Sequence, residues 1–247
     1  MLLNGKNAII TGCNRGIGRA ILEAFAANGA NVWAFVRKEC DSFMEDILNL
    51  SKKYNVKIMP IYCDFADPDQ IRLAIKQIQT MKLPVDILVN NAGITYNSLF
   101  QMSSNDKLKE IFNINFFSIF TFSQYIIKFM VRQKSGSIVN ISSSAGIDGN
   151  PGKSVYGASK AAIICMTKSM AAELGEYNIR VNSIAPGITD TQMLSSMTEE
   201  VISQTLEASD MKRAGKPVEI ANTTVFLASD LSTYITGQVI RVDGGLK

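Results

Sequence analysis

Seven short apolar runs alternate with longer segments of helical periodicity along this chain, and this alternation constrains the fold more than any other feature. Most of the runs lack a strict alternation of apolar and polar residues, which is typical of strands buried on both faces. The order strand, helix, strand predicts an α/β fold with a doubly wound parallel sheet of about seven strands and helices on both faces. The expected strands are residues 7–11, 31–36, 57–62, 86–90, 137–141, 180–185 and 238–242, and the expected helices include 19–27, 68–80, 108–131 and 155–176.

A single domain is the simplest organisation of residues 1–247, because no linker, repeat or low-complexity tract interrupts the chain. Its length is sufficient for a substantial core. The segment 190–215 departs from the alternation. It carries an amphipathic pattern away from any strand, which favours a substrate lid or a plain surface helix. The apolar residues of this pattern are Met193, Leu194, Met197, Val201, Ile202 and Leu206.

Charge and residue usage exclude several classes of protein. The net charge is +3 without a basic cluster, so no nucleic-acid partner is expected. No apolar run approaches the ~18 residues of a membrane span, and the first residues lack the apolar segment of a secretory signal. The chain has four scattered cysteines and no histidine. We therefore expect no metal site, no disulfide framework, a cytoplasmic location and no histidine-dependent nucleophile.

A glycine-rich stretch, IITGCNRGIGRA, separates the first expected strand from the first expected helix. Such glycines allow a tight turn, close approach of the backbone to a pyrophosphate and a helix N-terminus aimed at the anion. The alternative is a glycine turn without a ligand, but the flanking strand and helix favour dinucleotide binding. The residues expected to bind the cofactor here are Gly12, Asn14, Arg15, Gly16, Ile17 and Gly18.

The end of the second expected strand indicates which dinucleotide binds. An acidic residue usually stands there when the cofactor carries a free 2'-hydroxyl, whereas this chain places Arg37 and Lys38 after Val36. Arginine forms planar, charge-assisted hydrogen bonds with phosphate. The sequence therefore predicts NADP rather than NAD, with Arg37 at the 2'-phosphate.

Five motifs together resemble the short-chain dehydrogenase/reductase family: TGCNRGIG, NNAG at 90–93, ISSSAG at 141–146, YGASK at 156–160 and PGITDT at 186–191. They stand in the order and spacing of that family, and the resemblance runs from about residue 5 to residue 245. It implies a Rossmann-type fold and an NADP-dependent oxidoreductase acting on CH–OH or C=O groups. The stretch 213–245 is similar to the branch that reduces 3-oxoacyl groups on an acyl carrier protein in fatty acid biosynthesis.

The resemblance implies that Tyr156 is the general acid/base and that Lys160 is the cation beside it. A spacing of four places both on one helical face. An adjacent ammonium favours the phenolate of a tyrosine, and a neutral tyrosine can donate a proton to a forming alkoxide. The small residues around the pair, such as Gly157, are expected to leave room for a nicotinamide and a carbonyl. From the residues alone, a core tyrosine with a solvated lysine is the alternative.

A serine and an asparagine complete the implied catalytic set. Ser143 matches the hydroxyl that orients the substrate carbonyl, and alignment on Gly146 selects it over Ser142 and Ser144. Asn115 matches the asparagine that bends the long central helix, with Asn113 as the competing candidate.

The resemblance also implies cofactor contacts at the ends of later strands. Asp64 is similar to the acid near the adenine, and Phe65 follows it. The remaining contacts expected from the family are Asn91, Ala92 and Gly93 near the ribose, Pro186, Gly187, Thr189 and Thr191 near the carboxamide, and Tyr156 and Lys160.

Three functions are compatible with these residues. The leading hypothesis is reduction of a 3-oxoacyl thioester by NADPH. The resemblance implies that an acyl carrier protein docks on basic surface beside the active site, and Arg132 and Lys134 are candidates for that surface. The second is an NADP-dependent reductase or dehydrogenase of another ketone or secondary alcohol, such as a sugar or polyol. The third is a cofactor-binding regulator without turnover. The intact Ser143, Tyr156 and Lys160 favour an enzyme.

Self-association is expected from the long central helix. Its phenylalanines supply more apolar surface than one helix face can bury in a monomer, which is consistent with a homo-oligomer. The resemblance implies a tetramer. The residues concerned are Phe116, Phe117, Phe120 and Phe122.

Overall fold

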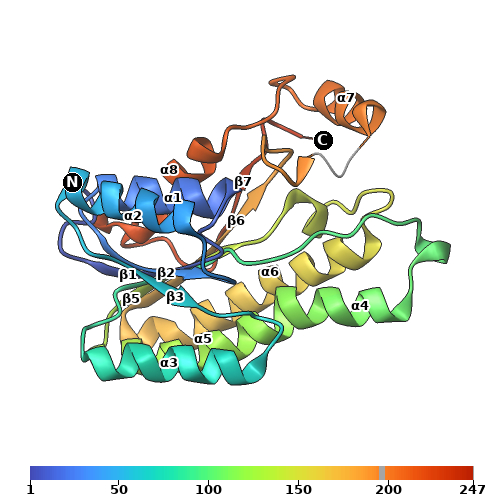
Figure 1. Cartoon of the computed structure of the whole chain (residues 1–247). Helices are drawn as coiled ribbons and strands as arrows, with labels where there is room; N and C mark the ends of the chain where they lie inside the picture. Colours follow the sequence, from blue (N-terminus) through green and yellow to red (C-terminus); the bar gives the residue numbers. More distant parts are fainter. Residues whose placement is uncertain (195–197, 247) are drawn as a thin grey trace.

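The computed structural model describes residues 1–194 and 198–246, and seven parallel strands within them form one sheet. The strand order is β3-β2-β1-β4-β5-β6-β7, so the direction of winding reverses between β1 and β4 (Figure 1). This confirms the doubly wound sheet, and ligands of such sheets bind outside the carboxyl ends of the strands at the reversal. The strands are β1 (Asn7–Thr11), β2 (Asn31–Val36), β3 (Ile58–Tyr62), β4 (Ile87–Asn90), β5 (Gly136–Ile141), β6 (Ile179–Pro186) and β7 (Val239–Val242).

Helices cover both faces of the sheet, as predicted: α1, α2 and α8 pack on one face and α3, α5 and α6 on the other (Figure 1). Ala8 and Ile10 of β1 belong to the first core and Ile9 to the second, and all three are fully buried. This two-sided burial explains why the strands lack alternation. The helices are α1 (Gly16–Ala27), α2 (Asp41–Tyr54), α3 (Pro68–Met81), α4 (Asn105–Phe112), α5 (Ser118–Gln133), α6 (Ser154–Leu174), α7 (Glu199–Ala208) and α8 (Pro217–Ala228), with short 3-10 turns η1 (Phe100–Met102), η3 (Ser144–Gly146), η4 (Gly175–Tyr177) and η6 (Asp230–Ser232).

The helix expected over residues 108–131 has three parts, because a π-helical turn, η2 (Asn113–Phe117), joins α4 to α5. By length and composition the continuous segment Asn105–Gln133 is apolar enough to cross a membrane. Its apolar side packs on the sheet, where Phe122, Ile126 and Met130 are fully buried. Core packing therefore accounts for part of its hydropathy, since 39% of its most apolar stretch is buried.

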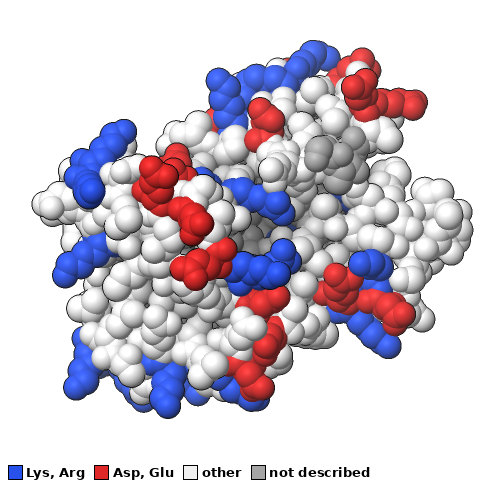
Figure 2. Space-filling view, in the orientation of Figure 1, with Lys and Arg blue, Asp and Glu red and all other residues white. Residues whose placement is uncertain are grey.

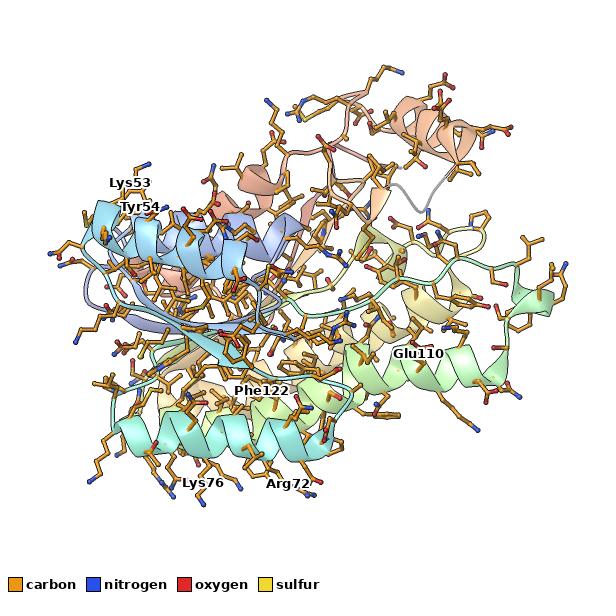
Figure 3. The ribbon with its side chains drawn as sticks, viewed as in Figure 1. Lys53, Tyr54, Arg72, Lys76, Glu110 and Phe122 are labelled. Carbon is orange, nitrogen blue, oxygen red and sulfur yellow. The ribbon has the colours of Figure 1, made fainter. Side chains whose placement is uncertain are left out.

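The four phenylalanines of η2 and α5 divide between core and surface. Phe122 is fully buried under the sheet (Figure 3). Phe117 and Phe120 keep 54% and 42% of their surface exposed, and both rings contact Phe116. The chain alone therefore leaves part of this apolar surface uncovered, as the sequence predicts.

The amphipathic segment 190–215 contains α7, which stands apart from the layers of the fold (Figure 1). None of the ten residues of α7 is fully buried. A bridge between Thr189 and Gly215 closes the base of the segment. A helix is confirmed over Glu199–Ala208, whereas Met193 and Leu194 lie before it. Met197 lies outside the described residues, and movement of the segment as a lid stays a prediction.

Candidate active site

The glycine loop connects the end of β1 to the start of α1. Gly12 and Gly16 have φ angles of +75° and +57°, a region that other residues seldom adopt. A Cβ atom on Gly18 would lie 2.1 Å from the carbonyl oxygen of Gly12. The first turn of α1 has no side-chain cap and no acidic residue. The loop therefore leaves backbone amides at a helix N-terminus, which suits a phosphate group.

Asn91 ties the NNAG motif to the glycine loop. Its Nδ2 donates hydrogen bonds to the carbonyl oxygens of Thr11 (2.9 Å) and Gly12 (3.2 Å). The backbone N–H groups of Asn91 and Ala92 both donate to Thr11 Oγ1 at 2.9 Å. The carboxyl ends of β1 and β4 are thereby held together at the reversal of the sheet.

Two exposed cations, Arg37 and Lys38, follow β2. In the described part of the chain, no carboxylate lies within 4 Å of either charged group. Arg15 differs from them, since its guanidinium donates to Gln192 Oε1 at 2.6 Å. Figure 2 shows basic side chains on both sides of a hollow in this face. Arg37 and Lys38 are thus available to an anion.

Asp64 and Phe65 follow β3 and have different surroundings. Asp64 is half-buried, and its Oδ1 accepts a hydrogen bond from the N–H of Ala66 at 2.9 Å. The Phe65 ring is 6% exposed and contacts the Phe122 ring, with centroids 5.3 Å apart. The Phe65 carbonyl oxygen accepts a hydrogen bond from Ser118. Phe65 can therefore reach a cofactor only through its backbone, because its ring belongs to the core.

The segment after β6 lies against the glycine loop. Pro186 ends the strand, and Thr189 Oγ1 donates to the carbonyl oxygen of Gly187 at 3.1 Å. A Cβ atom on Gly16 would lie 3.3 Å from Thr191 Cγ2. The structure thus brings together two of the motifs expected to share one ligand.

Ser143 lies beside Tyr156 beyond the carboxyl end of β5, close enough for its hydroxyl to influence the pKa of the phenol. Burial raises the pKa of the Tyr156 phenol, and the Ser143 hydrogen bond opposes this shift. The phenol therefore holds its proton at neutral pH. Ser142 is turned away, because its Oγ donates to the carbonyl oxygen of Ile184 at 2.8 Å. This placement supports the middle serine of the motif.

Gly157 and Gly146 form a tight packing seam. A Cβ atom on Gly157 would lie 2.6 Å from the carbonyl oxygen of Ala145, and one on Gly146 would lie 2.8 Å from the Ala161 nitrogen. The expectation that Gly157 leaves room for ligands is therefore wrong. The seam instead lets η3 approach α6, and this approach carries Ser143 to Tyr156.

Lys160 is buried beside Tyr156, as the spacing of four predicts. Its Nζ lies 5.9 Å from the centroid of the Tyr156 ring and donates to the carbonyl oxygen of Ile141 at 2.9 Å. A Cβ atom on Gly93 would lie 3.4 Å from this Nζ. Burial lowers the pKa of Lys160 to about 8. The ammonium form therefore still predominates near the phenol at neutral pH.

Asn115, rather than Asn113, is the buried asparagine of the π-helical turn. Its Oδ1 accepts from the N–H of Ile94 (2.8 Å), and its Nδ2 donates to the Ile94 carbonyl oxygen (2.9 Å) and to Ser159 Oγ (3.1 Å). Ser159 Oγ in turn donates to the carbonyl oxygen of Tyr156 at 2.7 Å. Asn115 thus connects the loop after β4 to the helix that carries Tyr156.

The motifs did not indicate one further cation at the site, Lys153. Its Nζ lies 5.5 Å from the centroid of the Tyr156 ring and donates to Thr95 Oγ1 (3.4 Å) and to Asn97 Oδ1. The only signal in the sequence is a lysine three residues before the tyrosine. Its relation to the site depends on the loop after β4, which the sequence does not place.

Arg132 and Lys134 lie at the end of α5, directly before β5. Gln133 between them accepts a hydrogen bond from the N–H of Val85, shortly before β4. Both cations therefore flank the amino-terminal edge of the sheet, whereas Ser143 follows the carboxyl end of β5. Within one chain they are not beside the active site, contrary to the expectation.

Comparison with known proteins identifies relatives over the whole chain. The family model for enoyl-(acyl carrier protein) reductase matches residues 12–247. The 3-oxoacyl-(acyl-carrier-protein) reductase FabG of Thermotoga maritima is 41% identical, covering 100% of this chain and 99% of the relative. A 3alpha-hydroxysteroid dehydrogenase of Mediterraneibacter gnavus is 40% identical over the same shares of both chains.

Solved structures agree with this result. A putative gluconate dehydrogenase from Agrobacterium tumefaciens is similar with a TM-score of 0.92 and 30% identity, covering 99% of this chain and 96% of the other. A 3-oxoacyl-(acyl-carrier-protein) reductase from Brucella melitensis with bound NAD has a TM-score of 0.86 and 34% identity, covering 99% and 92%. The fold and the order of motifs are thus shared by proteins named for several substrates.

Proposed function

This chain belongs to the short-chain dehydrogenase/reductase family of oxidoreductases, and from that premise we propose that it reduces 3-oxoacyl thioesters to 3-hydroxyacyl thioesters with NADPH. The observation that carries the proposal is the placement of Ser143 beside Tyr156, with the Lys160 ammonium 5.9 Å from the centroid of the Tyr156 ring. The 41% identity to a 3-oxoacyl-(acyl-carrier-protein) reductase over the whole chain supports the thioester.

Tyr156 is the proton donor in this proposal. The hydroxyl groups of Ser143 and Tyr156 donate hydrogen bonds to the substrate carbonyl oxygen, and Tyr156 transfers its proton to that oxygen as negative charge develops. The bound NADPH would supply the hydride that the carbonyl carbon accepts. Lys160 stabilises the phenolate that remains on Tyr156. The raised pKa of the phenol is compatible with reduction, which requires the protonated form at the start.

The chain's own residues fit an NADP molecule. The backbone of the glycine loop, where a Cβ atom on Gly18 would fill the space, suits the pyrophosphate. Arg37, which has no carboxylate within 4 Å among the described residues, suits the 2'-phosphate. The Brucella melitensis reductase is a structure with NAD, so selectivity is the point to test. The other residues proposed to hold the cofactor are Gly12, Asn14, Arg15, Gly16, Ile17, Asp64, the Phe65 backbone, Asn91, Ala92, Gly93, Tyr156, Lys160, Pro186, Gly187, Thr189 and Thr191, with Asn115 positioning α6.

Acyl carrier protein as the substrate's carrier and a homotetramer as the assembly also belong to this proposal. The exposed faces of Phe117 and Phe120 favour association through the central helices. A groove of about 390 Å³ on the same surface, between α5 and α6, is bordered by Tyr125 and Met170. Carrier docking draws no support from Arg132 and Lys134 of the same chain. A cytoplasmic location stays the prediction made from cysteine usage.

A ketone or secondary alcohol of another class is the second candidate function. The relative named 3alpha-hydroxysteroid dehydrogenase is nearly as similar to this chain as the reductase is. A similar structure is named putative gluconate dehydrogenase. The fold therefore does not determine the substrate. A non-catalytic regulator is disfavoured, because Ser143, Tyr156 and Lys160 are all present in one arrangement.

Absorbance of NADPH during incubation with acetoacetyl-CoA tests the proposal. We expect turnover with NADPH and at least tenfold less with NADH, since the free energy of a charge-assisted hydrogen bond corresponds to about that ratio. Turnover of a sugar or polyol ketone without turnover of acetoacetyl-CoA would transfer the assignment to the second candidate. No turnover of any ketone, with NADPH still bound, would contradict the enzyme assignment.

A further inference from the structure

Lys153 places a second ammonium group at the reacting phenol. The residue directly precedes α6, and its Nζ lies 5.5 Å from the centroid of the Tyr156 ring. It differs from Lys160, which is 5% exposed and bonded to the Ile141 carbonyl oxygen. Lys153 is only half-buried. A substrate whose carbonyl oxygen is hydrogen-bonded to the Tyr156 hydroxyl therefore lies next to a residue whose ring faces the Lys153 ammonium.

The partners of Lys153 are neutral. Its Nζ donates to Thr95 Oγ1 and Asn97 Oδ1, which both belong to the loop after β4. In the part of the chain that the structure describes, no carboxylate lies within 4 Å of this Nζ. An ammonium has three donor hydrogens, so one remains for a ligand after these two bonds.

The charge of Lys153 is unfavourable where the chain alone places it. Burial lowers the pKa of Lys153, which means that the surroundings disfavour its charged form. The first turn of α6 contains no acidic residue, and a cation near the positive end of a helix is repelled. An anion next to Lys153 would offset both the loss of hydration of its ammonium and the repulsion from the helix N-terminus. The site therefore has the electrostatics of an anion subsite beside the reacting carbonyl.

We propose that Lys153 binds a carboxylate of the substrate within a few bonds of the ketone, so that free short 3-oxo acids are substrates of this enzyme. The inference rests on the proposed carbonyl reduction at Tyr156 but does not require a thioester. In this reaction the carbonyl carbon accepts the hydride from NADPH, and the oxygen accepts the Tyr156 proton. The carboxylate stays ionised and accepts a charge-assisted hydrogen bond from Lys153.

Acetoacetate and methyl acetoacetate form a matched pair of test substrates, because they share the 3-oxo chain and differ in the negative charge. In Lys153→Gln, we expect kcat/KM for acetoacetate to fall at least about tenfold, the loss of one charge-assisted hydrogen bond. The value for methyl acetoacetate should change less than about threefold. Lys153→Arg should restore most of the activity on acetoacetate, since it keeps the charge.

Lys53→Gln is the matched control. Lys53 also lies over a tyrosine ring, with its Nζ 5.0 Å from the Tyr54 centroid, but at the end of α2 (Figure 3). We expect the same kcat/KM as the unmodified enzyme on both substrates. Thermal unfolding of Lys153→Gln, with NADPH bound, separates lost charge from lost folding, and Lys153→Arg provides a second variant if Gln is poorly folded.

The outcomes separate this inference from the proposed function. Turnover of acetoacetyl-CoA and methyl acetoacetate without turnover of acetoacetate would overturn the role of Lys153 and leave thioester reduction intact. Equal losses on both substrates in Lys153→Gln would overturn it as well. If no ketone is reduced, calorimetric titration of acetoacetate into the enzyme with NADP still tests whether Lys153 binds a carboxylate. We expect heat of binding for the unmodified chain and for Lys153→Arg, and none for Lys153→Gln. Identical titrations for all three would reject the subsite.

Discussion

The nucleotide side and the substrate side of the candidate active site are built from different kinds of contact. On the nucleotide side, the shape depends on the backbone: Gly12 and Gly18 allow strand, turn and helix to approach, and Asn91 bonds directly to backbone oxygens of the loop. On the substrate side, the positions depend on side chains from separate loops. Lys153 reaches Thr95 and Asn97 there, and Phe100 further along the same loop is 82% exposed.

This difference shows which side is free to vary. A side chain in the glycine loop would collide with backbone, so few substitutions are compatible with the fold. The loops around the substrate and α7 contribute little to the core, so they can change with small effects on stability. Relatives of nearly equal identity that are named for different substrates fit this division. The predictions below test it from either side.

The largest expected effect is the loss of turnover in Tyr156→Phe. Without the phenolic proton donor, kcat should fall by about 10²- to 10⁴-fold, the contribution of a positioned general acid. The dissociation constant of NADPH, measured by fluorescence titration, should stay within about threefold, because Tyr156 is only one of many residues proposed to hold the cofactor and the phenyl ring is kept. Tyr234→Phe is the control, since Tyr234 is fully exposed. Normal turnover in Tyr156→Phe would contradict the assignment of Tyr156 as the proton donor.

Gly18→Ala should weaken NADPH binding. Its Cβ atom would lie 2.1 Å from the Gly12 carbonyl oxygen and 2.4 Å from Asn91 Nδ2, so the backbone of the loop must move. Overpacking of this kind costs about 1–3 kcal/mol, or about 5- to 150-fold in affinity.

Gly175→Ala provides the matched control for this change, because a Cβ atom there meets open space. Titration with NADPH and thermal unfolding should both leave Gly175→Ala unchanged. Unchanged affinity in Gly18→Ala would mean that the backbone of the glycine loop does not set the nucleotide side, and the comparison would fail.

Arg37→Ala should affect one cofactor and not the other. Loss of a charge-assisted hydrogen bond to the 2'-phosphate should raise the NADPH dissociation constant about tenfold and leave that of NADH within about twofold. Arg72→Ala, on the exposed side of α3 (Figure 3), should change neither value. Equal effects on both cofactors would remove the argument for NADP.

Much of the fold and of the geometry of the glycine loop could be predicted from the sequence, because both depend on residues that are close together in the chain. Two-sided burial of β1 gave apolar runs without alternation, and the spacing of four between Tyr156 and Lys160 fixed a shared helix face. Glycines that cannot carry a side chain marked the turn. The choice of Asn115 over Asn113 also agrees with the buried side chain that the structure places in the π-helical turn.

The remaining features depend on contacts between distant segments. The sequence suggests open space at Gly157. Its close approach to the Ala145 carbonyl oxygen depends on where η3 packs, which the sequence does not show. The Phe65 ring belongs to the core, whereas its neighbour Asp64 is half-buried. The position of the Lys153 ammonium depends on its hydrogen bond to Asn97, which lies 56 residues away in the sequence. Arg132 and Lys134 lie at the amino-terminal edge of the sheet because they directly precede β5, whose carboxyl end carries the site.

The smallest expected effect near neutral pH is a pH dependence of stability at Lys160, which grows only at higher pH. Burial lowers its pKa to about 8 in the folded chain, whereas an unfolded lysine has a pKa of ~10.4. Between these values the unfolded chain binds more protons, so the free energy of unfolding rises with pH through this group. The slope is at most ~1.4 kcal/mol per pH unit and vanishes below about pH 8.

Urea unfolding at several pH values can isolate this contribution by comparing the chain with Lys160→Met. The difference in free energy of unfolding between them should rise from about pH 8 to about pH 10 in favour of the unmodified chain. The exposed Lys76 on α3 supplies the control, since Lys76→Met should give a difference that does not change with pH (Figure 3). A flat difference for Lys160→Met would mean that the buried ammonium is not disfavoured, and that the catalytic side carries its charge without a cost to the fold.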